Sequence, residues 1–190
     1  MGQPKHVPYR RGLSGYHRAH IVSASYIYPL PFWRKGERWY QRTFGNWQLS
    51  GIVMLETGVP MDISAPGDPA GIGGTGGSLR PDVVGDWKAG GKTAQTWFNT
   101  AAFKTPAPGT FGNLGRGVLI GPGIVNWDAS IQKNFRLRER YTASFRVEYF
   151  NVLNHLNYWG VDGSMASARF GQVTTRTDPR TFQAMVRLSF

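Results

Sequence analysis

Few residues of this chain have the types and spacing that catalysis or metal binding requires. The chain has no cysteine, so disulfides, thiolate metal sites and a cysteine nucleophile are excluded. His17 and His20 are close in the chain, but residues three apart on a strand face opposite sides, which argues against a shared metal ion. The glycines of residues 71–77 lack the Lys-Ser/Thr that completes a phosphate loop. We therefore expect no enzyme activity, no metal and no cofactor.

One charged pair has strand spacing. Arg146 and Glu148 are two residues apart, so on a strand they share one face. We expect them to form a polar ladder with Arg187, and to contact a ligand only as a less favoured alternative. The other acidic residues are mostly scattered in loops and form no acid–base pair.

The net charge of +11 raises the question of an anionic partner. The Lys and Arg residues are scattered, and no basic helix, zinc knuckle or aromatic RNA-binding motif accompanies them. Nucleic acid is therefore not expected as a partner, and attraction to an anionic membrane surface is favoured.

The elements that position these residues are long strands with period-two alternation. Each of them has 9 to 12 residues: 17–28, 46–57, 125–135, 141–150 and 182–190. Strands of soluble proteins centre on about 5–6 residues, whereas a tilted strand needs about 9–11 to cross a bilayer. The pattern predicts an all-β fold, an antiparallel transmembrane β-barrel segment of about five strands that belongs to a larger barrel.

Alternation assigns the two faces of these strands. Phe145, Val147 and Tyr149 are expected to face lipid, as are Val186 and Leu188. The candidates for the lumen face are Gln132, Ser144, Arg146, Glu148, Gln183 and Arg187. The last strand has an apolar row that ends in an aromatic residue and is interpreted as a barrel-assembly signal: Phe182, Ala184, Val186, Leu188 and Phe190.

The connections differ greatly in length. Residues 58–124 and 151–180 form two long stretches, the first of them rich in glycine, and we interpret them as flexible external loops. If the chain ends in the periplasm, strand parity puts both of them outside. Residues 29–45 and 136–140 then lie on the periplasmic side.

A series of motifs resembles TonB-dependent receptors, most closely the large Oar-like type with an N-terminal carboxypeptidase-regulatory-like domain. In order along the chain the motifs are Arg11-Gly12-Leu13-Ser14, His17-Arg18-Ala19-His20, Asn46-Trp47-Gln48-Leu49-Ser50-Gly51-Ile52, Thr57-Gly58-Val59-Pro60, Trp97-Phe98-Asn99, Asn126-Trp127-Asp128 and Arg146-Val147-Glu148-Tyr149-Phe150-Asn151. The series continues to the terminal strand and covers nearly the whole chain. The chain departs from the family at Gly15-Tyr16-His17, where acidic residues are common and could pair with Arg18 and His20.

The resemblance implies a barrel of about 22 strands with a plug inside it. It also implies a location in the bacterial outer membrane and energy-coupled uptake of a nutrient, of the siderophore, oligosaccharide or peptide class. The implied partners are membrane lipid and lipopolysaccharide, the rest of the barrel and plug, the TonB complex, the barrel-assembly machinery and an unknown nutrient ligand.

The plug, the TonB-contacting segment and a secretory signal have no counterpart in these 190 residues. We therefore expect residues 1–190 to be the C-terminal part of such a barrel. The alternative is a secreted all-β binding or adhesion module without a transport role, and a small complete barrel is less expected.

Overall fold

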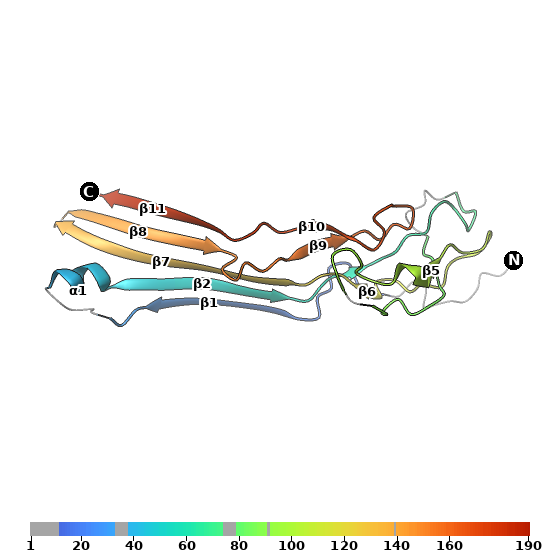
Figure 1. The fold of residues 1–190 in the computed structure, drawn as a ribbon, viewed down its shortest axis with the longest axis horizontal. Coiled ribbons are helices and arrows are strands. Elements are labelled where there is room, and N and C mark those ends of the chain that lie inside the picture. Colours follow the sequence, from blue (N-terminus) through green and yellow to red (C-terminus); the bar gives the residue numbers. More distant parts are fainter. Residues whose placement is uncertain (1–11, 33–37, 74–78, 91, 139) are drawn as a thin grey trace. The chain divides into compact units, whose positions relative to one another are not determined.

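Five long strands form one sheet in this protein, seen in a computed structural model that describes residues 12–32, 38–73, 79–90, 92–138 and 140–190. They are β1 (Ile21–Pro29), β2 (Trp47–Glu56), β7 (Ile124–Arg138), β8 (Tyr141–Phe150) and β11 (Thr181–Ser189). Their order is β1-β2-β7-β8-β11, and neighbouring strands run in opposite directions (Figure 1). With 9, 10, 15, 10 and 9 residues, each is long enough for a tilted strand that crosses a bilayer.

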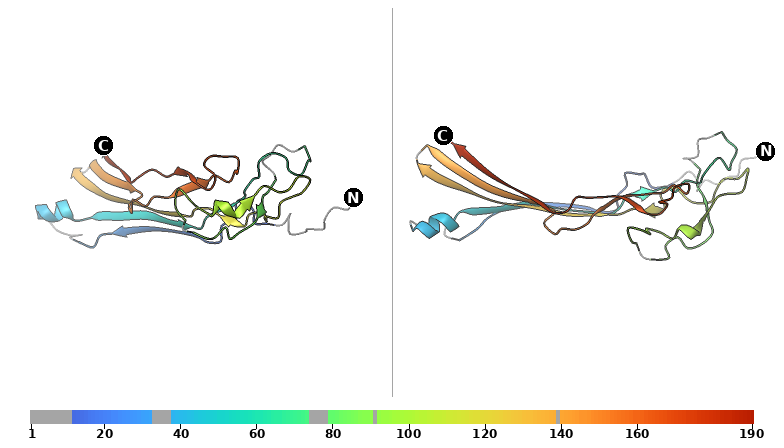
Figure 2. Two further views of the ribbon diagram at one scale, coloured as in Figure 1. Left: turned by 45° about the vertical axis from the view of Figure 1, so that its right-hand side comes forward. Right: turned by 45° about the horizontal axis from the view of Figure 1, so that its top comes forward.

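The all-β antiparallel prediction is confirmed. The first strand begins later than expected, at Ile21, because the backbone N–H of His17 donates to the Ser14 carbonyl at 2.8 Å and forms a turn there. His17 and His20 therefore precede the strand, and the argument about their opposite faces does not apply to them. β7 extends beyond the expected end at Phe135 and carries a bulge between Arg136 and Arg138. Figure 2 shows the five strands twisting together along their length.

The connection between β1 and β2 contains a short helix that the sequence pattern did not predict, α1 (Trp39–Phe44). The Gln41 side chain accepts from the Arg38 N–H at 3.2 Å, and the Gly45 N–H donates to the Gln41 carbonyl at 2.9 Å, so both helix ends are satisfied locally. Asn46 follows with φ of 58°, a left-handed conformation that Asn tolerates. This residue turns the chain from the helix into β2.

The chain divides into two compact units, each described here by itself. The sheet unit comprises residues 21–56, 125–156 and 178–190. The connection unit comprises the residues up to His20 together with 57–124 and 157–177, and thus most of the two long connections. Its short elements are β3 (Pro60–Met61), β4 (Asp82–Val83), the 3-10 helix η2 (Thr100–Ala102), β5 (Phe103–Lys104), β6 (Leu119–Ile120), β9 (Tyr158–Val161) and β10 (Val173–Arg176).

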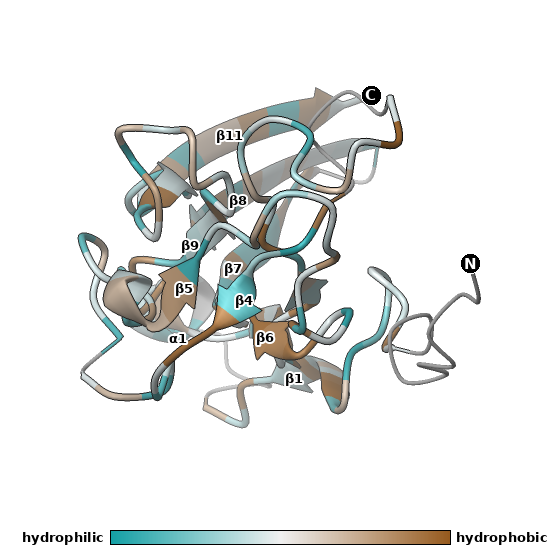
Figure 3. Cartoon of the chain, turned by 90° about the vertical axis from the view of Figure 1, so that its right-hand side faces the viewer, coloured by the Kyte–Doolittle hydropathy of each residue, from teal (hydrophilic) through white to brown (hydrophobic). Residues whose placement is uncertain are grey.

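The described parts of the two long connections contain paired short strands and a buried core, while Gly74, Gly76 and Gly77 of the glycine-rich run lie outside the described residues. The short strands pair as β3–β6, β4–β5 and β9–β10, and the apolar strand β6 stands out in brown in Figure 3. The buried core of this unit consists of Ile63, Phe98, Ala102, Phe103, Leu114 and Leu119. Phe170, from the second connection, packs against Phe98 with ring centroids 5.4 Å apart. The two connections therefore share one core.

Close backbone approach explains one glycine of this unit. A Cβ at Gly58 would lie 1.8 Å from the Gly121 carbonyl oxygen, which no side chain tolerates. The Gly121 N–H donates to the Val59 carbonyl at 2.9 Å in the same place. The start and the end of the first connection are thereby held together, next to the end of β2 and the start of β7.

Candidate functional site

The register of the sheet brings the six lumen candidates onto one face, here called the polar face. Residues directly opposite each other on neighbouring strands share a face. The sets of opposed residues that carry the candidates are Ser130–Glu148–Gln183, Gln132–Arg146–Met185 and Asn134–Ser144–Arg187. The structure thus places Gln132, Ser144, Arg146, Glu148, Gln183 and Arg187 together, and their lumen role stays a prediction.

Glu148 is the centre of a small ion-pair network on the polar face. Its Oε1 lies 2.5 Å from Nη2 of Arg146, and its Oε2 accepts a hydrogen bond from Nε2 of Gln183. Arg187, expected in a polar ladder with this pair, lies on the same face opposite Ser144, and the residue that binds Glu148 across the strands is Gln183. The pairing across β8 and β11 depends on a connection of about thirty residues, so spacing along the chain could not predict it.

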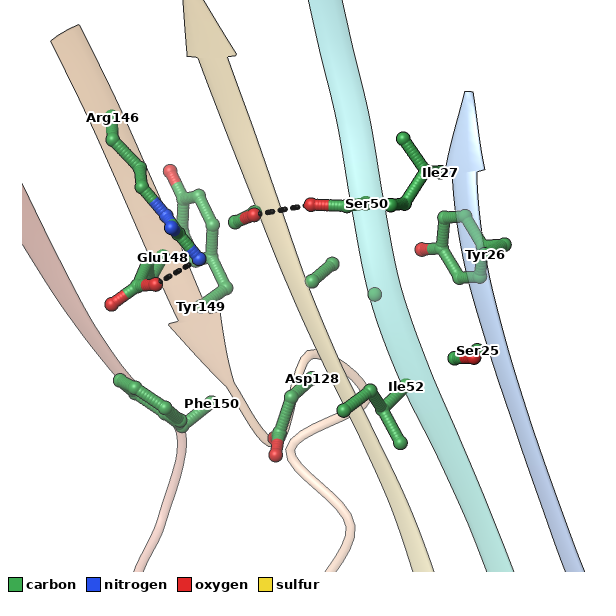
Figure 4. Close-up of a pocket in the computed structure, with 13 residues that line it drawn as sticks. Ser25, Tyr26, Ile27, Ser50, Ile52, Asp128, Arg146, Glu148, Tyr149 and Phe150 are labelled. Carbon is green, nitrogen blue, oxygen red and sulfur yellow. Dashed lines mark hydrogen bonds and ion pairs between the residues drawn. The ribbon is translucent and has the colours of Figure 1, made fainter. Parts of the chain in front are cut away.

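A shallow hollow of about 390 Å³ lies over the polar face beside this network (Figure 4). Ser50 and Ser130 share a hydrogen bond of 2.8 Å across β2 and β7 at its centre. Arg146 and Glu148 lie on one side of it, and Ile27 and Ile52 on the other. The polar face is therefore polar over β7, β8 and β11 and mixed over β1 and β2.

Arg146 has donor capacity in this hollow that the described residues do not use. Its Nε is buried and has no hydrogen-bond partner among them. Asp128, which also lines the hollow, accepts the backbone N–H of Asn151 at 2.9 Å. The surface thus offers a guanidinium, hydroxyls and carboxylates to a polar partner.

The opposite face of the sheet, here called the apolar face, holds the row interpreted as an assembly signal. Its opposed pairs are Phe182–Tyr149, Ala184–Val147, Val186–Phe145 and Leu188–Ala143. The β11 side chains of this face are exposed, with Val186 at 68% and Leu188 at 66%, whereas Phe145 and Val147 of β8 are half-buried. Phe190 follows β11 and is 97% exposed. An extended apolar surface of this kind needs a nonaqueous neighbour, while the assembly role of the row stays a prediction.

One charged residue interrupts the apolar face. Lys133 lies opposite Phe145, yet it is only 3% exposed. Its ammonium donates to the carbonyls of Thr43 and Gly45 at 2.7 and 2.6 Å, at the C-terminal end of α1. The ring centroids of Phe135 and Trp47 lie 4.8 and 5.7 Å away. In the sequence Lys133 is visible only as a break in the alternation of its strand. That break is the signal that could have indicated another element, here α1, covering this part of the face.

A comparison with family models matches residues 1–183 to the outer membrane beta barrel domain. The chain belongs to this family. The searches of curated proteins and of solved structures each returned no match. As an outer-membrane β-barrel domain the protein is located in the bacterial outer membrane, and membrane lipid is its environment. The apolar face of the sheet unit is the surface suited to that lipid, and the polar face is suited to the barrel interior.

No group of three or more His, Cys, Asp or Glu side chains in the described ranges could hold a metal ion. No helix in the described part of the chain is long and apolar enough to span a membrane. Arg18, which follows the departure from the family pattern at Gly15-Tyr16-His17, donates from Nη1 to the Thr57 carbonyl at 2.9 Å.

Proposed function

We propose that this outer-membrane β-barrel domain is the C-terminal barrel part of a TonB-dependent receptor of the Oar-like type. In this role the receptor binds a nutrient at the cell surface and imports it with energy supplied through TonB. The proposal includes a plug inside the barrel and assembly by the barrel-assembly machinery. It also holds that the chain acts in binding and transport and not as an enzyme.

The observation that carries the proposal is the fold of the two long connections. Both leave the same end of the antiparallel sheet, after β2 and after β8, and both contribute to the core that contains Phe98 and Leu119. A receptor needs fixed side chains to hold a ligand, and connections that share a packed core can provide them. The motif series from Arg11 to the terminal strand supports the TonB-dependent type.

The polar face adds support for a filled barrel. An ion pair between Arg146 and Glu148, with a buried Arg146 Nε that has no partner among the described residues, suits a barrel interior that contains another polar surface. Membership of an outer-membrane family argues against the secreted binding module. A receptor plug is the partner that the proposed function supplies for this face.

Growth experiments in the source bacterium test the proposal. Deletion of the gene should abolish growth on one limiting nutrient from a panel of ferric siderophores, oligosaccharides and peptides. Deletion of the TonB gene should abolish growth on the same nutrient, and a plasmid copy of the receptor gene should restore it only in the first strain. Unchanged growth on the whole panel, or a defect that does not depend on TonB, would contradict the proposal.

A further inference from the structure

The connection unit contains a hollow of about 880 Å³ that has no part in the polar face. Trp87 and Trp97 form its aromatic walls, and Phe98 and Leu119 of the buried core also line it. Lys88, Lys92 and Arg116 also line it. This set of residues is here called the cationic aromatic pocket.

The aromatic walls are held in place by the rest of the unit. Nε1 of Trp97 donates to the Ile120 carbonyl at 3.0 Å, which fixes the plane of that indole. The Trp87 carbonyl accepts the backbone N–H of Asn99 at 3.1 Å, and both tryptophans pack against the core. A pocket with prearranged aromatic surfaces loses little entropy when a flat ligand binds to it.

The cations around these walls are not neutralised by the lining. The Nζ atoms of Lys88 and Lys92 lie 5.1 and 5.5 Å from the ring centroids of Trp87 and Trp97. Arg116 lies 3.7 Å from the Asp62 carboxylate, and that pair is exposed. No carboxylate is among the described residues that line the pocket. The pocket is therefore apolar on its walls and positively charged.

We propose that the cationic aromatic pocket binds an organic anion with a flat apolar body, such as an aromatic carboxylate. The apolar body packs against the apolar lining of the pocket, and the anionic group binds the ammonium groups of Lys88 and Lys92. A small inorganic anion would leave the apolar walls unfilled, and a neutral aromatic molecule would bring no negative charge to Lys88 and Lys92. As the substrate class of the receptor, this inference rests on the proposed function.

Calorimetric titration of the full-length protein in a nonionic detergent tests the pocket. The probe is 2-naphthoate, and the comparison ligands are neutral 2-naphthamide and acetate. We expect 2-naphthoate to bind, 2-naphthamide to bind at least about tenfold more weakly, and acetate not to bind. Titration of micelles without protein corrects for partition of the probe into detergent.

Variants assign the binding to this pocket. The double substitution Lys88→Gln and Lys92→Gln should weaken 2-naphthoate binding about tenfold or more. Trp87→Leu should weaken the binding of both 2-naphthoate and 2-naphthamide. Lys104→Gln, at an exposed cation of β5 in the same unit that does not line the pocket, is the matched control and should change neither. Equal binding of 2-naphthoate and 2-naphthamide, no binding of 2-naphthoate, or an equal loss in the Lys104→Gln variant would overturn the proposal.

The outcome separates the pocket from the proposed function. Binding of 2-naphthoate together with TonB-independent growth contradicts the receptor and leaves the pocket supported. TonB-dependent growth without 2-naphthoate binding overturns the pocket and leaves the receptor in place.

Discussion

Lys133 shows how a single residue joins a helix to a lipid-facing sheet. Its ammonium is buried on the apolar face and donates to two carbonyls at the end of α1. A charge that is almost fully buried needs such partners, because its desolvation is costly unless hydrogen bonds compensate for it. Cations also interact favourably with the carbonyls of a helix C-terminus. We therefore regard Lys133 as the residue that fastens α1 to the sheet.

The first prediction concerns this contact. Lys133→Met keeps the apolar stem and removes the donor, so the Thr43 and Gly45 carbonyls lose a charge-assisted hydrogen bond each. Such a bond contributes roughly 1.5–3 kcal/mol, and the docking of α1 should weaken accordingly. Amide hydrogen exchange of residues 39–45 in the full-length protein in nanodiscs should become faster. Arg136→Met, at an exposed position of the same strand, is the control, and unchanged exchange in the Lys133 variant would show that α1 is held by other contacts.

The second prediction concerns pH and lies outside the membrane-spanning strands. The pKa of Asp162 is lowered, first by the hydrogen bond from the Ser167 side chain and then by that from the Ser164 N–H, at 2.9 Å. A carboxyl with a lowered folded-state pKa stabilises the fold above its unfolded value of about 3.9, and this stabilisation is lost as the pH falls through the folded value. Asp162→Asn should therefore speed amide exchange around Ser164 at neutral pH. The free energy of local opening should fall by no more than about 1 kcal/mol, the contribution of a typical hydrogen bond. The ratio of variant to wild-type exchange should approach one as the pH drops below about 4, and a ratio independent of pH would contradict the assignment.

At the scale of the strand, two adjacent residues of β11 separate the faces. Ala184 lies opposite Val147 on the apolar face, and Gln183 lies opposite Glu148 on the polar face. Ala184→Arg should lower the free energy of unfolding by about 2–4 kcal/mol if the position is near the middle of the membrane. Gln183→Arg should cost much less, since the new charge meets the Glu148 carboxylate. Urea unfolding of the full-length barrel in lipid vesicles measures both, and equal costs would show that the assignment of the faces is wrong.

Strand alternation made most of the sheet predictable from the sequence. Tyr141–Phe150 was predicted at the bounds that β8 has, because each residue there matches a face that is either lipid-like or polar. The pairing of Glu148 with Gln183 was not predictable, since it depends on register across a long connection. The same holds for Ser50 and Ser130, which are eighty positions apart in the chain.

The connection unit shows the opposite case. Its core residues Ile63, Phe98 and Leu119 stand in stretches without helical or strand period, among glycines and prolines. Their burial results from contacts between distant segments, which neither propensity nor periodicity reveals. The short helix α1 escaped prediction for a related reason, because it has only six residues and is held by Lys133 from a distant strand. The cationic aromatic pocket lies in the part of the chain that sequence reasoning treated as flexible.

At the scale of the whole molecule, the two units place different demands on their surroundings. The connection unit buries its own core, as water-exposed structure requires. The sheet unit leaves large apolar side chains exposed on β1, β8 and β11, and it gains its stability from lipid and from neighbouring strands. An outer-membrane location explains both the buried core of one unit and the exposed apolar side chains of the other, because one chain can then contact water and lipid.

The last prediction follows from the edges of the sheet. In the described residues β1 and β11 each pair with a neighbour on one side only, and each has nine residues. Unpaired edges of that length, next to an apolar face, act as templates for association with other chains. A bacterial barrel that closes on itself needs at least about eight strands. Residues 1–190 expressed alone in water should therefore aggregate, while addition of detergent or lipid should reduce the aggregation by covering the apolar face. Size-exclusion chromatography with light scattering measures this, and a monodisperse monomer with a cooperative melt in detergent-free buffer would contradict a membrane-dependent sheet.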